Sequence, residues 1–393
     1  MFNSIKIIFR NTVKKILNKY YSTKTFFPQE KTLLILRIDA IGDYILFRNF
    51  IESIKKSERF KDYKITLAGN PTWKNIAETF DKEFIDNFIW IDKTRIKKKG
   101  EWLYRFSILE KIRNGRFETM IIPNDTTSKL IMDLKKHSGV RNIIEKESDS
   151  VYLHHDIKKV LEKETYEKDH RKYLEIFFQF YRNKRFAEEV IKNKINLSKP
   201  FFKISKQKPE RDYVVIFPGA GYQERVWLAV NYGKVCRKIS ENTDLDIFVC
   251  GNKSDRKAAK IIIEESGNGK IKDLTDATSL SELVNLIANA KLLISNETCA
   301  VHIAASVETK TICISNGNHI GRFNPYPEEI SKNIETIYPL EITNSFNRFP
   351  ELINEHHFLS TVNINSITPE EVFEKAEKHL LPKHVRKYSD VDK

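Results

Sequence analysis

Cysteine is scarce in this sequence: the 393 residues include four, namely Cys236, Cys250, Cys299 and Cys313. None of them forms a C-x-x-C motif or another paired spacing typical of metal ligands. A small domain held together by disulfides would instead be rich in cysteine. The pattern therefore favours reduced thiols, most of them buried, in a cytosolic protein over a disulfide framework.

Long apolar runs are also missing, and no stretch is long enough to cross a bilayer as a helix. We find no internal repeat of solenoid length and no low-complexity tract. The apolar fraction of 40% and the aromatic fraction of 11% are typical of a globular protein. A length of 393 residues suggests two domains of ordinary size.

The charge is unbalanced, with a formal net charge of +14 and a pI near 9.3. This balance indicates an anionic partner, which could be a nucleotide, a nucleic acid or a membrane surface. The chain has no RNA-binding signature such as RNP1 and no basic stripe with interleaved aromatic residues inside the domains. We therefore expect no nucleic-acid partner, because binding of that kind relies on such features.

Acidic residues are absent before Phe26, whereas the same segment holds six basic ones: Lys6, Arg10, Lys14, Lys15, Lys19 and Lys24. Apolar residues between Phe2 and Tyr20 recur on one helical face, so residues 1–30 are predicted to form a basic amphipathic helix. Charges interrupt any apolar core that a signal peptide would need. Two interpretations stay open: residues 1–25 bind an anionic membrane surface, which would place a cytoplasmic protein on the inner face of the membrane, or they pack on the protein itself.

The stretch LLILRIDAIGDYILFRNFIESIKKS, residues 33–57, organises the N-terminal part of the chain. Its apolar start predicts a strand buried on both faces over residues 33–38, followed by a short loop over residues 39–43. A helical period then runs from Phe47 to Ile54. Because α/β sheets bind ligands at such loops, Asp43 at the junction can either cap the helix or face a cleft.

Two later stretches repeat this strand, loop and helix order. In VVIFPGAGYQERVW, residues 214–227, a buried strand precedes Pro218, Gly219, Ala220 and Gly221. In LLISNETCAVHIAAS, residues 292–306, a strand and a polar loop precede a helix that opens near Cys299. In order and character the three stretches resemble glycosyltransferase family nine, whose best-known members are the ADP-heptose:lipopolysaccharide heptosyltransferases. The resemblance spans residues 33–327.

Strands and helices alternate through the rest of the chain. Further strands are predicted at residues 65–69, 88–91, 119–122, 213–217, 245–250, 292–294 and 311–314, with a short one after Val140. Asn70 and Pro71 open one helix, and Ser279 with Glu282 opens another in a capping arrangement. The aromatic segment 170–181 and Trp227 are predicted to belong to the core.

The resemblance implies a GT-B fold, an α/β architecture in which two Rossmann-like domains with parallel sheets face a central cleft. Residues 31–205 would form the acceptor-binding domain and residues 206–365 the domain that binds the nucleotide sugar. Residues 366–393 would form a C-terminal helix and tail. The lysine-rich stretch around residues 205–211, with Pro209, is the predicted boundary.

On the acceptor side, Asp43 matches the aspartate that the family uses as the general base of an inverting single displacement. The alternative from the sequence alone is a helix-capping aspartate. Asp39 and Gly42 share the loop and are predicted to bind the acceptor, although many heptosyltransferases carry a small polar residue where Asp39 stands. Two carboxylates in one loop could raise one another's pKa, or Asp39 could bind an acceptor hydroxyl.

On the donor side, Gly219, Ala220 and Gly221 allow backbone N–H groups to approach a diphosphate, and the helix after them would add a positive end. Arg225 matches a lysine of the family and is expected to neutralise the departing phosphates. The further donor-binding residues implied by the resemblance are Glu297, Thr298, Cys299 and His302. Arg322, in a segment that could close over the nucleotide, is a second candidate for the phosphates. Glu297 and Cys299 stand where the family usually has an aspartate and a glycine, and His302 could equally be a core histidine.

We expect no metal site, since Arg225 and helix N-termini can supply the positive charge. We interpret the D-x-D pattern at Asp244 and Asp246 as turn chemistry, and adjacent histidines at His154 and His155 point apart. No cofactor is expected beside the donor substrate, for which ADP-heptose is the leading candidate.

The predicted function is an inverting, metal-independent transfer of sugar to a lipopolysaccharide core, an O-antigen or another lipid-linked glycan. Two alternatives are a nucleotide-sugar epimerase of the same build, which would convert the donor alone, and a glycan-binding descendant without turnover.

Overall fold

The computed structural model describes residues 19–21, 26–96, 101–125, 128–146, 170–267, 270–356 and 358–381. Residues 1–18, which carry most of the predicted amphipathic helix, lie outside the described residues, as do His154, His155 and Asp156. None of the helices in the described part of the chain has the length and apolarity that crossing a membrane requires.

The first half is built on a parallel sheet with the strand order β3-β2-β1-β4-β5. Its strands are β1 (Gln29–Arg37), β2 (Lys64–Gly69), β3 (Asn87–Trp90), β4 (Phe117–Ile122) and β5 (Asn142–Glu145). β1 lies in the centre, where Leu33 pairs in register with Ile65 on one side and with Thr119 on the other. This central position explains the continuous apolar run of β1, because both of its faces are covered.

The second half repeats the plan with a parallel sheet in the order β11-β10-β9-β6-β7-β8. Its strands are β6 (Tyr213–Phe217), β7 (Asp246–Val249), β8 (Ile271–Asp273), β9 (Leu292–Asn296), β10 (Thr311–Ile314) and β11 (Ile334–Ile337). Both orders are those of the dinucleotide-binding fold, in which the order of the strands reverses between the first and the fourth strand although all strands are parallel. Two Rossmann-like sheets are therefore present, as the sequence predicted.

The edge strands β8 and β11 were missed by the sequence analysis. Each is short, and neither shows an uninterrupted apolar run: β8 exposes Lys272 and Asp273, and all four residues of β11 are only half-buried. An edge strand has a neighbour on one side only and needs no such run.

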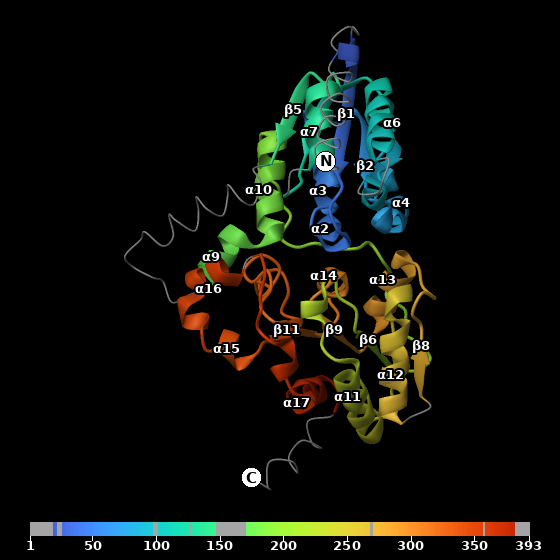
Figure 1. Ribbon diagram of the computed structural model, residues 1–393, viewed down its shortest axis with the longest axis vertical. Coiled ribbons are helices and arrows are strands. Elements are labelled where there is room, and N and C mark those ends of the chain that lie inside the picture. The colour runs from blue at the N-terminus through green and yellow to red at the C-terminus, as the bar shows by residue number, and fades with distance from the viewer. Residues whose placement is uncertain are drawn as a thin grey trace, which may run out of the picture.

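Helices cover both sheets (Figure 1). Those of the first half are α2 (Ile41–Ile45), α3 (Asn49–Lys56), α4 (Lys74–Phe80), α5 (Lys93–Ile96), α6 (Glu101–Asn114), α7 (Lys129–His137), α9 (His170–Phe177) and α10 (Gln179–Ile191). Those of the second half are α11 (Ala229–Asn242), α12 (Arg256–Ser266), α13 (Leu280–Asn289), α14 (Cys299–Val307), α15 (Leu340–Thr343), α16 (Phe349–His356) and α17 (Pro369–Leu380).

Several capping predictions are confirmed. Asn70 accepts a hydrogen bond from the backbone N–H of Thr72, although the first turn after it is a 3-10 turn. Ser279 and Glu282 form a capping box at the start of α13.

The core predictions are confirmed as well. Trp227 is fully buried and donates its indole N–H to the carbonyl of Ile367. The aromatic segment 170–181 is largely buried, and its helix is interrupted at Phe178.

One prediction about the first loop is wrong. The chain does not form a loop over residues 39–43, because α2 already begins at Ile41 with Ala40 as its N-cap. Tyr44 stacks on Trp73 with ring centroids 3.9 Å apart, and this contact buries the short helix against the next βα unit. Asp43 consequently lies in the first turn of α2 and is not its cap.

The two halves contact each other through α2 and α14, which face each other in the middle of the molecule (Figure 1). Helix α4 also contacts α13, and α9 contacts α16. Helix α10 returns to the first half and packs on α3, and α17 packs on α11, β9 and β10 of the second half. The predicted boundary at residues 205–211 falls between α10 and β6.

Candidate functional site

A cavity of about 800 Å³ lies between the two halves, at the carboxyl ends of both sheets. From the first half it is lined by the turn after β1 and by Asp125, which follows β4. From the second half it is lined by the segments that follow β6, β7, β8, β9 and β10. The reversal points of both sheets thus open into one space, which is where ligands of such sheets bind.

Asp43 reaches this cavity from the first turn of α2, with 14% of its side chain exposed. Its carboxylate Oδ1 lies 3.3 Å from Nη2 of Arg322 in the second half and 4.0 Å from Nη2 of Arg37. The same Arg37 guanidinium donates a hydrogen bond to the backbone carbonyl of Asp43 at 3.1 Å. Asp43 is therefore held from two sides while its carboxylate remains accessible from the cavity.

Asp39 lies one turn earlier and is more deeply buried. Its Oδ1 accepts a hydrogen bond from the Asn124 amide at 3.1 Å, and its Oδ2 lies 3.6 Å from Nε of Arg37. Burial raises the pKa of Asp39 to about 6; Arg37 opposes this rise, and the nearby Asp43 adds to it. The predicted effect of one carboxylate on the other is thus present at Asp39, but desolvation is the larger cause.

We expect the raised pKa of Asp39 to make folding stability depend on pH. Between the usual value near 4 and the folded value of about 6, the native state binds a proton that the unfolded chain does not. The contribution of Asp39 to the free energy of unfolding therefore falls as the pH rises from about 4 to about 6. Urea unfolding at pH 4.5 and pH 7 should show a smaller loss for Asp39→Asn than for the wild type; equal losses would contradict the assignment.

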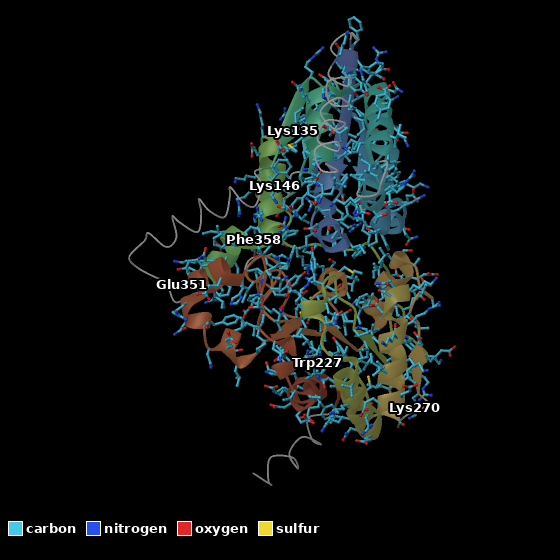
Figure 2. All side chains as sticks on the ribbon, in the orientation of Figure 1. Lys135, Lys146, Trp227, Lys270, Glu351 and Phe358 are labelled. Carbon is cyan, nitrogen blue, oxygen red and sulfur yellow. The ribbon has the colours of Figure 1, made fainter. Side chains whose placement is uncertain are left out.

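A buried charge cluster behind these aspartates was not predicted from the sequence. Asp125 is its centre, with Lys146 at 2.5 Å, Arg322 at 3.3 Å, and Arg37 and Arg182 each at 3.7 Å. Burial opposes ionisation of Asp125, but Lys146, Arg322, Arg182 and Arg37 together outweigh it and hold its pKa well below the usual range. Lys146 lies next to α10 (Figure 2), where it also reaches the side chain of Asn183.

A signal for this cluster exists in the sequence. Arg37 is the last residue of the apolar strand β1, Asp125 follows β4, and Lys146 directly follows β5. Charged residues at the carboxyl ends of neighbouring parallel strands come together at one edge of the sheet. The signal is weak, because which strands are neighbours is decided only when the sheet forms.

The glycine-rich turn after β6 contributes Gly219, Ala220 and Gly221 to the cavity. A Cβ atom on Gly221 would lie 2.8 Å from Nη2 of Arg225, so glycine leaves room for this guanidinium. The Arg225 side chain also lies over the ring of Tyr222, 5.4 Å from its centroid. Among the described residues no carboxylate lies within ion-pairing distance of Arg225, so its charge is available to an anion in the cavity.

The helix after the glycine turn begins beyond the basic and the aromatic residue, as predicted, but it does not bring its N-terminus to the cavity, because neither Leu228 nor Ala229 lines it. A single 3-10 turn, Gln223–Arg225, comes first, and α11 starts at Ala229. The chain between them is extended because Trp227 is inserted into the core (Figure 2). Helix α14 brings its N-terminus to the cavity near this turn, since Thr298 and Cys299 at its start are among the lining residues.

Asn296, the last residue of β9, ties the second and third motifs together. Its amide donates to the carbonyl of Pro218 at 2.5 Å, and its oxygen accepts from the backbone N–H of Trp227 and from the Tyr232 hydroxyl. The glycine turn is thereby fixed relative to the segment that carries Glu297. Sequence reasoning did not single out Asn296.

Glu297 lines the cavity and is almost completely buried. Its Oε2 accepts a hydrogen bond from the Ser315 hydroxyl at 2.5 Å, whereas its Oε1 has no hydrogen-bond partner in the described protein. Burial raises the pKa of Glu297, and Arg225 counteracts part of that rise. An unsatisfied buried carboxylate oxygen at a cavity wall is suited to accept a ligand hydroxyl.

His302 is held at the contact between the halves. Its Nδ1 lies 2.5 Å from the hydroxyl of Tyr326, and burial lowers the pKa of His302 to about 3, so the ring is neutral. The ring touches Gly42 of α2, and the site where a Cβ of Gly42 would be is 2.7 Å from its Cδ2. This packing favours the core-histidine alternative for His302 and a contact role for Gly42.

Replacing Gly42 with alanine should destabilise the protein. Alanine normally favours a helix over glycine by about 1 kcal/mol, but here its methyl group would overlap a ring that Tyr326 and burial keep in place. We expect overpacking to dominate and to lower the free energy of unfolding by about 1 to 3 kcal/mol. Urea unfolding of Gly42→Ala, compared with that of the wild type, measures this. A more stable Gly42→Ala protein would contradict the prediction.

Arg322, which was predicted to bind phosphate, contacts carboxylates instead. Its guanidinium is directed at Asp43 and Asp125, which favours a role at these carboxylates over phosphate binding.

Additional polar residues that line the cavity and were not predicted are Thr72, Lys93, Asn252, Asp255, Asp276 and Thr278. Asp244 pairs with Lys270 just before β7, at the amino-terminal end of that strand, and does not line the cavity. No cluster of three or more potential metal ligands occurs within the ranges that the structure describes.

Comparison with known proteins agrees with this geometry. The profile of glycosyltransferase family 9 (heptosyltransferase) matches residues 105–347. Lipooligosaccharide heptosyltransferase 2 of Campylobacter jejuni is 29% identical over 118 residues, which are 29% of this chain and 37% of that protein. The matched part therefore spans little more than a third of that relative.

Solved structures show the same fold. A glycosyl transferase family 9 protein of Veillonella parvula has a TM-score of 0.64 at 15% identity and covers 90% of this chain and 98% of its own. The E. coli heptosyltransferase WaaC with ADP has a TM-score of 0.62 at 12% identity, covering 88% and 99%. Two facing Rossmann-like domains with the cavity at their reversal points define a protein of the GT-B class. The chain belongs to glycosyltransferase family 9.

Proposed function

We propose that this protein transfers a sugar from a nucleotide-diphosphate sugar to a hydroxyl group of a lipopolysaccharide core, an O-antigen or another lipid-linked glycan, with inversion of the anomeric centre. The observation that carries the proposal is the arrangement across one cavity of about 800 Å³: Asp43 enters from the first half, and Arg225 with the glycine turn enters from the second. A volume of that size accommodates a nucleotide sugar together with part of an acceptor.

The two sides can divide the chemistry between them. Asp43 takes the proton of the acceptor hydroxyl. At the same time the hydroxyl oxygen forms a bond to the anomeric carbon, and the bond from that carbon to the diphosphate breaks. The electron pair of the broken bond goes to the diphosphate. Arg225, the N–H groups of the glycine turn and the first turn of α14 stabilise this charge. Because one displacement occurs from the face opposite the leaving group, the anomeric configuration inverts.

ADP-heptose is the leading donor. Family membership supports it, as does the structural likeness to a heptosyltransferase that was solved with ADP. We assign the diphosphate to Arg225 and to Gly219–Gly221, and sugar or ribose hydroxyls to Glu297, whose Oε1 lacks a partner in the described protein. Since a guanidinium neutralises phosphates without help, we propose that transfer needs no metal ion.

A thermal-shift panel of ADP, UDP, GDP, CDP and dTDP, with and without magnesium, tests the donor site. We expect stabilisation by ADP that magnesium does not change; at one hundred times the dissociation constant it amounts to about 2.7 kcal/mol. Incubation with ADP-heptose and a lipopolysaccharide core acceptor should then yield a product with the inverted anomeric configuration by NMR. Conversion of the donor without an acceptor would indicate the epimerase alternative, and acceptor binding without turnover the glycan-binding one.

A further inference from the structure

Arg322 is the point where the second half reaches the proposed base. Its Nη2 lies 3.3 Å from Oδ1 of Asp43 and also 3.3 Å from Oδ2 of Asp125. Both aspartates belong to the first half, whereas Arg322 follows β10 of the second. A single nitrogen therefore bridges two cavity-lining carboxylates, of which Asp125 is the more deeply buried, across the contact between the halves.

The position of Arg322 is fixed without help from Asp43. The backbone N–H of Gln179 donates to the carbonyl of Arg322 at 2.9 Å, and Nε of Arg322 donates to Oε1 of Gln179 at 3.0 Å. The Gln179 amide then donates to Oδ2 of Asp125 at 2.8 Å. Gln179 and Asp125 are almost completely buried, and Arg322 is 7% exposed. Such a closed hydrogen-bond network holds a side chain in one geometry.

Asp125 is anchored in turn. Lys146 pairs with its Oδ1 at 2.5 Å, and Arg37 and Arg182 lie within 3.7 Å of the carboxylate. Because three other cations hold this aspartate, Arg322 is not needed to neutralise it. The contact from Arg322 to Asp43 accordingly acts on the more exposed of the two cavity-lining carboxylates.

We propose that Arg322 is a positioning residue for the transfer reaction: it orients the Asp43 carboxylate toward the acceptor hydroxyl. This inference rests on the proposed function, specifically on Asp43 as the base. Since Arg322 and Arg225 belong to the same half, the part of the chain that would bind the donor also orients the base. The base is then fully oriented only when the two halves are in contact as they are in this structure.

The test compares Arg322→Gln with the wild type in steady-state kinetics and in ADP titration. We expect kcat to fall about 100-fold, as for a misplacement of reacting groups, while the donor KM and the dissociation constant of ADP change less than about twofold. Arg322→Lys keeps the charge but offers one ammonium in place of a planar fork, so it should restore only part of kcat. Arg348→Gln, at an exposed arginine of the same half, should behave like the wild type.

Two results would overturn the proposal. An unchanged kcat for Arg322→Gln is one, and a loss of ADP affinity as large as that of Arg225→Gln is the other, since it would make Arg322 a phosphate ligand. If Arg322→Gln does not fold, Arg322→Lys decides: a kcat well below that of the wild type supports positioning and a full kcat refutes it.

Asp43→Asn separates this proposal from the proposed function. Full turnover by Asp43→Asn removes the base and the proposed mechanism together. An inactive Asp43→Asn beside a fully active Arg322→Gln refutes positioning alone. In the Asp43→Asn background, Arg322→Gln should lower the residual rate less than about twofold, because a residue that acts through Asp43 has nothing left to orient.

Discussion

Asp43→Asn should lower kcat by about a thousandfold while ADP still binds. A general base contributes roughly 10²- to 10⁴-fold to a rate, and an amide cannot take the proton of the acceptor hydroxyl. The substitution keeps the shape of the side chain and leaves an oxygen near Arg322 at the Oδ1 position. Measurement of initial rates with ADP-heptose and acceptor, together with ADP titration, gives both quantities.

The matched control is Asp62→Asn. Asp62 has 62% of its side chain exposed and pairs only loosely with Lys31 at 3.4 Å on the surface of the same half. We expect its kcat and its thermal midpoint to stay close to the wild-type values, since exposed pairs contribute little. Near-normal turnover of Asp43→Asn would exclude Asp43 from the mechanism and direct attention to Asp39, another carboxylate that lines this part of the cavity.

Arg225→Gln should weaken both donor binding and turnover. No carboxylate of the described residues pairs with Arg225, so a diphosphate in the cavity is the natural partner of its charge. Removing one charged donor from a site of developing charge costs about 10²- to 10³-fold in kcat, and we also expect the dissociation constant of ADP to rise about tenfold or more. Folding should survive, because the substitution breaks no ion pair of the described protein.

Two comparisons make this prediction specific. Arg225→Lys should retain most of the activity, because lysine is the residue that the family carries at this spacing. Arg237→Gln removes an arginine of α11 that is 48% exposed and pairs with Glu265, and it should leave ADP binding unchanged. Unaltered ADP affinity in Arg225→Gln would separate Arg225 from the phosphates and refute the assignment.

Local pattern was enough for most of the fold. The central strands β1, β4, β6 and β9 carry uninterrupted apolar runs because helices cover both of their faces, and such runs are visible in the sequence. The edge strands β8 and β11 were not found because one neighbour is enough for an edge strand, so no run is required. The start of α2 was misplaced for another reason: the stacking of Tyr44 on Trp73, which buries that turn, joins two separate βα units.

The site divides in the same way. Motif order was sufficient to select Asp43, the glycine turn, Arg225 and Glu297, and all of them line one cavity. It could not give the partners of Arg322, because Asp43 and Asp125 lie 279 and 197 residues away in the chain and meet it only through the contact of the halves. Nor could it show that the ring of His302 packs against Gly42.

By itself, the sequence of this protein determined which segments become strands and which glycines, carboxylates and arginines follow them, since apolar period and turn chemistry act over a few residues. The tertiary structure alone decided which of these charges share a space. Strand order brings Arg37, Asp125 and Lys146 to one edge of the first sheet, and the docking of α14 on α2 places Arg322 against Asp43. Ionic and hydrogen-bond contacts depend on distances of a few ångströms, which only the packed chain sets.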